Sequence, residues 1–160
     1  MDTTSLSKAM TVQPSAEIVE QARLACEAVF PGTRVFLAYA HGSRVQGVAR
    51  SDSDLDIGYY LDSGRSPPLS IAEEMRLADR LSCRLGVEVD LRNLGAAPLE
   101  WRARVLEQGF RLYCADETAR VTVERELMVR WFDERPRLER IHAERLRSFA
   151  TTGLAPGQCP

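Results

Sequence analysis

The residues best suited to chemistry are a Gly-Ser pair, Gly42 and Ser43, and two aspartates, Asp54 and Asp56, that follow after ten residues. The apolar run before the pair, residues 35–40, predicts a buried strand that the Gly-Ser pair ends. On a following strand, the two aspartates would project from one face because they lie two positions apart. Carboxylates beside a phosphate-binding loop indicate Mg²⁺ on a nucleoside triphosphate.

The loop between the two groups carries the candidate phosphate contacts. A short helix is expected over about residues 44–48, and free N–H groups at such a helix start bind phosphate. Arg44 and Arg50 are near enough in sequence to reach phosphate oxygens, or to pair with Asp52 instead. His41, just before the loop, fits a packing residue that sets the turn better than it fits a phosphate or acceptor contact.

A third acid follows about thirty residues later. Residues 87–91 alternate as a strand that carries Glu88 and Asp90 on one face. A helical stretch separates this strand from the one that carries Asp56. Either acid is therefore a candidate to join the first two.

The segment from residue 40 to residue 91 resembles the minimal nucleotidyltransferases of the DNA polymerase β superfamily, the MNT type. That family's pattern is Gly-Ser, a spacer of about ten residues, Asp-x-Asp on a strand, and a third carboxylate on a later strand. The resemblance implies that Asp54, Asp56 and Asp90 are the catalytic carboxylates and hold two Mg²⁺ ions. It also implies that Gly42, Ser43 and Arg44 bind the phosphates of ATP, the nucleotide substrate.

The resemblance further implies a biological role. Short members of this family resemble antitoxins paired with a HEPN-domain ribonuclease toxin, and active members attach AMP from ATP to a tyrosine of that toxin. We therefore expect an Mg²⁺-dependent protein adenylyltransferase that forms a hetero-oligomer with a HEPN toxin. Two alternatives stay open, which are adenylyl transfer to a small molecule such as an aminoglycoside, and an antitoxin that acts by binding alone.

Composition sets the limits within which this site must be built. The chain has 160 residues, 44% of them hydrophobic and 28% charged, which is typical of a single soluble domain. Its net charge of −2 gives no indication of direct nucleic-acid binding. The four cysteines lack zinc-site spacing, and we expect neither a signal peptide nor a membrane span, so a cytoplasmic protein is predicted.

The elements that must position the site follow from periodicity, glycines and prolines. The predicted fold is α/β (α+β), a minimal nucleotidyltransferase fold with a mixed sheet of about four strands flanked by helices and a long C-terminal helix. Residues 1–13 are expected to be a disordered lead-in, 14–150 a single domain and 151–160 a frayed tail. The expected elements are helix 14–30, strand 35–40, strand 55–61, helix 69–85, strand 87–91, helix 98–108, strand 110–114 and helix 116–150.

Two of the helices carry specific expectations. The buried side of helix 69–85 is predicted to consist of Leu69, Ala72, Met75, Leu77, Ala78 and Leu81. In the last helix, Pro136 is expected to bend or divide the helix. The same helix has an apolar set that either packs on its own sheet, the favoured interpretation, or forms a partner surface: Leu127, Met128, Trp131, Phe132, Leu138, Ile141 and Phe149.

Overall fold

The computed structural model describes residues 15–47, 53–62 and 67–152, and within them it contains each predicted helix and strand except the short loop helix. The first half contains α1 (Ser15–Val29), β1 (Val35–His41), β2 (Leu55–Leu61) and α2 (Ile71–Leu85). The second half contains β3 (Val89–Asn93), a 3-10 turn (Leu94–Ala96), α3 (Leu99–Gln108), β4 (Phe110–Cys114) and α4 (Glu117–Thr152).

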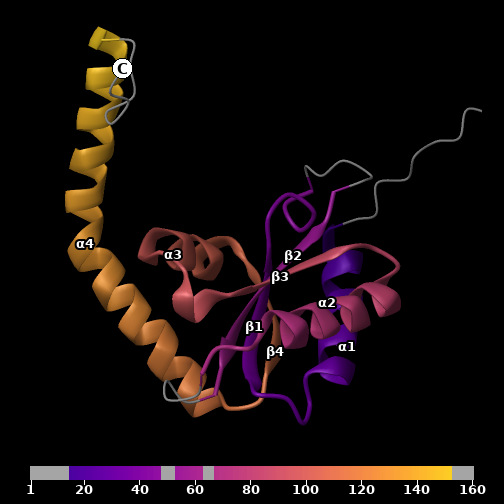
Figure 1. Ribbon diagram of the computed structural model, residues 1–160. Coiled ribbons are helices and arrows are strands. Elements are labelled where there is room, and N and C mark those ends of the chain that lie inside the picture. The colour runs from indigo at the N-terminus through magenta and orange to yellow at the C-terminus, as the bar shows by residue number, and fades with distance from the viewer. Residues whose placement is uncertain (1–14, 48–52, 63–66, 153–160) are drawn as a thin grey trace, which may run out of the picture.

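The four strands form one mixed sheet in the order β3-β2-β1-β4. The central strand β1 pairs antiparallel with β2 and with β4, whereas β2 pairs parallel with β3. Helices α1 and α2 cover one face of the sheet, and α3 and α4 lie on the other side (Figure 1). The predicted fold class, a mixed four-stranded sheet flanked by helices with a long C-terminal helix, is confirmed.

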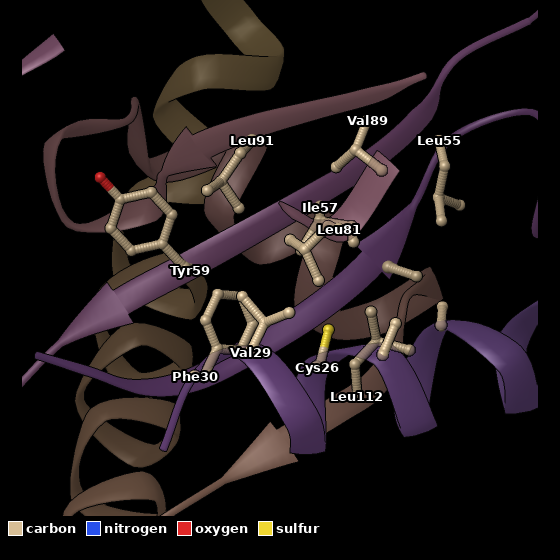
Figure 2. Packing of buried hydrophobic residues seen from close by; sticks show 14 of the residues in the cluster. Cys26, Val29, Phe30, Leu55, Ile57, Tyr59, Leu81, Val89, Leu91 and Leu112 are labelled. Atoms are coloured by element: carbon tan, nitrogen blue, oxygen red, sulfur yellow. The ribbon is translucent and has the colours of Figure 1, made fainter. Parts of the chain in front are cut away.

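Alternation along β2 divides its side chains between two cores. Leu55, Ile57 and Tyr59 are buried in the larger core, against α1 and α2 (Figure 2). Tyr60 lies in the smaller core on the opposite face, which α3 and α4 cover. Because successive strand residues point to opposite faces, Asp56 shares the face of Tyr60. Burial of the apolar β2 residues therefore orients this acid toward α3.

Local signals explain the bounds of α2. Ser70 caps its N-terminus in a capping box, in which Glu73 accepts a hydrogen bond from the Ser70 backbone N–H at 2.8 Å. Gly86 ends the helix in the left-handed conformation. Leu77 and Leu81 are buried as predicted, but Ala72 and Met75 are exposed, so their assignment to the buried side was wrong. The helix buries a narrower stripe than its apolar content indicated.

The loop after β1 differs from the prediction. Its described part, residues 42–47, forms turns rather than a helix, with a single i+4 hydrogen bond from the Gln46 N–H to the Gly42 carbonyl at 3.3 Å. Gly47, inside the expected helix, has a positive φ of 75°, which a right-handed helix excludes. The short helix over residues 44–48 was therefore wrong up to Gly47, and Val48, Arg50 and Asp52 lie outside the described residues.

Strand β3 begins two residues later than predicted, at Val89, and runs on to Asn93. Glu88 still participates in the sheet through its backbone, because its carbonyl accepts a hydrogen bond from the Leu55 N–H at 2.8 Å. The parallel alignment with β2 starts at the Leu55 and Val89 pair.

Helix α4 is continuous through Pro136 and bends along its length (Figure 1). Its first turns pack on the second core, and its next turns lie against α3, where the Trp131 indole donates to Glu107 at 3.1 Å. Its yellow C-terminal end extends past α3 in Figure 1. The favoured interpretation, that the apolar set packs on the sheet, was wrong for Phe132 and Phe149, which are 62% and 54% exposed.

Both chain ends largely lie outside the described part of the structure. The predicted lead-in, residues 1–13, is not described, and of the predicted tail only Thr151 and Thr152 are described, as the last residues of α4. Within residues 15–47, 53–62 and 67–152, no helix combines the length and the hydropathy needed to cross a membrane.

Candidate active site

The end of β1 and the starts of β2 and β3 lie together at one end of the sheet, and this brings the predicted acids close to one another. In the sheet register, Asp56 of β2 pairs with His41 at the end of β1 and with Asp90 of β3. Paired positions in neighbouring strands present their side chains to the same face, so Asp56 and Asp90 are side by side. Asp54 lies directly before β2, two positions ahead of Asp56, and is exposed.

The Gly42 backbone closes over the Asp56 carboxylate. A Cβ added at Gly42 would lie 3.1 Å from Asp56 Cγ and even closer to Oδ2, well inside contact distance. Gly42 also has a φ of 84°, a conformation that residues with side chains rarely adopt. Glycine at this position therefore allows the loop backbone and the carboxylate to approach each other.

Arg44 braces the same loop. Its Nε donates a hydrogen bond to the backbone carbonyl of Ser53, just before Asp54, so the side chain links the loop to the start of β2. The structure thereby places Arg44 beside the candidate phosphate site. Its predicted phosphate contact, like that of Ser43, stays a prediction.

Asp90 is held by an arginine on its own strand. Arg92 donates from Nε to Asp90 Oδ2 at 2.7 Å, and its Nη2 lies 2.6 Å from the same oxygen. The rival acid, Glu88, is exposed and precedes the strand, whereas Asp90 is the register partner of Asp56. Geometry therefore favours Asp90 over Glu88 as the third acid.

His41 and Trp101 form the wall of the site toward α3. The two rings meet edge to face with centroids 5.3 Å apart, and His41 Nε2 is buried without a hydrogen-bond partner among the described residues. This geometry agrees with the packing role expected for His41. Trp101 had not been predicted at the site, because a contact between a strand end and a helix some sixty residues later leaves no local sequence signal.

Burial and neighbouring acids shift the ionisation of two groups at the centre. Partial burial raises the pKa of Asp56, the negative charges of Asp90 and Asp54 raise it further, and His41 and Arg92 oppose the shift. Burial lowers the pKa of His41, against the opposing influence of Asp56 and Asp90. A cation bound here would favour the ionised form of Asp56 and so oppose the rise in its pKa.

The donor set fits a hard divalent cation such as Mg²⁺. Carboxylate oxygens are the ligands that Mg²⁺ prefers. Asp56 and Asp90 would supply them from two adjacent strands, and Asp54 from the residue directly before β2. Within the described residues, no group of three or more His, Cys, Asp or Glu side chains is already assembled around one point. The pairing of β2 with β3 thus aligns Asp56 with Asp90, while the three candidate side chains are not assembled around one point.

Comparison with known proteins adds a family to this geometry. Residues 26–118, more than half of the chain, match the sequence profile described as Polymerase beta, Nucleotidyltransferase. The chain belongs to this nucleotidyltransferase family. The matched segment of this chain includes the loop that begins at Gly42, called the Gly42 loop below, and the acids Asp54, Asp56 and Asp90. No curated protein sequence matches the chain significantly.

Solved structures show the same fold at low sequence identity. A chain of a toxin-antitoxin complex crystallised with AMP-PNP is 20% identical, with a TM-score of 0.59, over 82% of this nucleotidyltransferase and 98% of that chain. A chain of the MntA-HepT toxin-antitoxin complex is 18% identical, with a TM-score of 0.53, over 87% and 99%.

A third similar structure is a complex of tri-AMPylated Shewanella oneidensis HEPN toxin with MNT antitoxin. The matching chain is 18% identical, with a TM-score of 0.53, over 88% of this nucleotidyltransferase and 99% of that chain. These similarities show the minimal nucleotidyltransferase fold that the sequence predicted.

Proposed function

We propose that this nucleotidyltransferase transfers AMP from ATP to a tyrosine hydroxyl of a HEPN-domain toxin and thereby neutralises it. The observation that carries the proposal is that the Gly42 loop, Asp56 and Asp90 lie together at one end of the sheet. Relatives of the same fold support the choice of substrates, because one was crystallised with AMP-PNP and another with a tri-AMPylated HEPN toxin.

In the proposed reaction the tyrosine oxygen attacks the α-phosphorus of ATP. A new P–O bond forms to tyrosine, the bond between the α-phosphorus and the bridging oxygen breaks, and pyrophosphate leaves with that oxygen. The tyrosine proton passes to solvent. Mg²⁺ ions, when bound, would neutralise phosphate charge and lower the pKa of the attacking hydroxyl.

Each site residue has a proposed role in this reaction. Asp54, Asp56 and Asp90 would hold the cations, and the pairing of β2 with β3 fixes the spacing between the second and third of these acids. The Ser43 hydroxyl and the backbone N–H groups after Gly42 would bind the β and γ phosphates. Arg44, which already ties the loop to the Ser53 carbonyl, would add a charged donor beside them.

The proposed toxin-binding surface is the outer half of α4. Leu146 and Phe149 are more than half exposed there, and so is Phe132 near the middle of the helix. The C-terminal end of α4 extends past α3 (Figure 1). Large exposed apolar side chains that are rimmed by charged residues are typical of protein interfaces. A partner bound to α4 would lie on the side of the sheet that carries Asp56.

Co-expression with the toxin tests whether neutralisation is catalytic. We expect the Asp54→Ala, Asp56→Ala double variant to bind the toxin but to lose protection of the cells. The matched control is Asp62→Ala, Asp79→Ala, which removes two exposed carboxylates away from the site and should protect like the unaltered protein. Full protection by the site variant would mean that the chain acts by binding alone.

A further inference from the structure

We propose that the Arg92 guanidinium pairs with the Asp90 carboxylate until a divalent cation displaces it. Arg92 would then be a positioning residue that sets the cation affinity of the site. The inference rests on the proposed assignment of Asp90 as a cation ligand. It deepens that assignment by naming an internal competitor for the same oxygen.

The contact between the two residues is a charged one aimed at a single atom. Both Arg92 Nε, at 2.7 Å, and Nη2, at 2.6 Å, approach Asp90 Oδ2. A guanidinium usually divides its donors between the two oxygens of a carboxylate. Here both donors address one oxygen, and a cation that binds Oδ2 must replace them.

Arg92 has room to move away. Its side chain is 60% exposed, compared with 33% for Asp90. It lies on β3, an edge strand with no neighbour on its other side in the described sheet. Since exposed ion pairs contribute little to stability, release of Arg92 costs the fold little.

The surrounding charges favour the guanidinium in the absence of a cation. Besides Asp90, the nearby acids Asp56 and Glu74 raise the pKa of Arg92. The same negative field attracts Mg²⁺ or Mn²⁺, whose double charge and hard character suit carboxylate ligands better than a guanidinium does. Arg92 and the cation therefore compete for Asp90 Oδ2, and the same neighbouring acids attract both of them.

Titration with Mn²⁺ alone, followed by the electron paramagnetic resonance signal of free Mn²⁺, measures this competition without any catalysis. Removal of one positive charge a few ångströms from a divalent ion is expected to tighten binding about tenfold in a water-like medium. We expect Arg92→Ala to reach roughly this change, and Arg92→Lys, which keeps a charge but loses the planar fork, to lie between it and the unaltered protein.

Two controls separate competition from other effects. Arg104→Ala removes a similarly exposed arginine that pairs with Glu100 on α3, and it should change Mn²⁺ affinity less than about twofold. In an Asp90→Asn background, Arg92→Ala should no longer tighten binding, because the contested carboxylate is gone. Melting of the metal-free variants should be nearly unchanged, whereas a purely structural Arg92 would lower the melting temperature.

The outcomes distinguish this inference from the proposed function. Tighter Mn²⁺ binding by Arg92→Ala that disappears in the Asp90→Asn background supports the inference, even if no AMP reaches a toxin. Unchanged or weaker Mn²⁺ binding by Arg92→Ala and Arg92→Lys overturns it, even if the unaltered protein transfers AMP efficiently.

Discussion

Replacement of Gly42 by alanine should separate the fold from the function more cleanly than any other single change. The new Cβ would lie 3.1 Å from Asp56 Cγ and inside contact distance of Oδ2. Oδ2 belongs to the end of a flexible side chain, so the carboxylate is expected to rotate away while the strand stays in place. A displacement of about 1 Å at a reacting centre costs on the order of a hundredfold in rate.

The stability cost of the same change has a different origin. Gly42 has a φ of 84°, and a residue with a side chain in the left-handed region costs about 1–2 kcal/mol. Gly47, in the same loop, has a φ of 75° and no atom within 4 Å of an added Cβ. Gly47→Ala should therefore show a similar loss of unfolding free energy without displacement of Asp56.

Urea unfolding and the rate of AMP transfer, measured on both variants, make the comparison. We expect both to lose about 1–2 kcal/mol of stability and only Gly42→Ala to lose roughly a hundredfold in rate. If Gly42→Ala retained full activity, the Asp56 carboxylate would not be where the reaction takes place. If Gly47→Ala lost as much activity, loop conformation and not the Asp56 contact would be the cause.

Three further predictions follow from the described contacts. Burial raises the pKa of Asp56 above its ordinary 3.8, so ionisation of Asp56 destabilises the fold as pH rises through the raised value. Metal-free Asp56→Asn should therefore have a higher melting temperature than the unaltered protein at neutral pH and lose that advantage in acid. A lower melting temperature of Asp56→Asn at neutral pH would contradict this. Replacement of Phe132 and Leu146 by serine should weaken toxin binding at least about tenfold, whereas Ile71→Ser, equally apolar and exposed on α2, should not, as calorimetry would show; equal affinities would place the interface elsewhere. Ser70→Ala removes the cap of α2 and should cost about 1 kcal/mol in urea unfolding with no change in transfer rate; a large loss of activity would mean that α2 is coupled to the site.

The sequence predicted best those features that depend on short periodicities. Strand β2 was predicted with its observed bounds, because its apolar residues form one run interrupted near its start by the acid Asp56. The strand with Asp90 was displaced by two residues, since Val87 continues the alternation of Val89 and Leu91 but lies before the first register pair of the parallel ladder. Periodicity shows which residues alternate, and the partner strand decides where pairing begins.

Other features depended on backbone conformation or on distant contacts. The left-handed conformation of Gly47 is incompatible with the expected loop helix over residues 44–48, and a sequence does not state which glycines adopt that conformation. The contact of His41 with Trp101 joins elements far apart in the chain. The pairing of Arg92 with Asp90, in contrast, had a local signal, because residues two apart on a strand share a face.

The most direct test of the central claim is the intact mass of a HEPN-domain partner after incubation with this protein, Mg²⁺ and ATP. We predict mass gains in steps of one AMP on the partner, located on tyrosine, and their loss with Asp54→Ala, Asp56→Ala. A stable complex in which the partner gains no mass would contradict the claim that this site transfers AMP to a toxin.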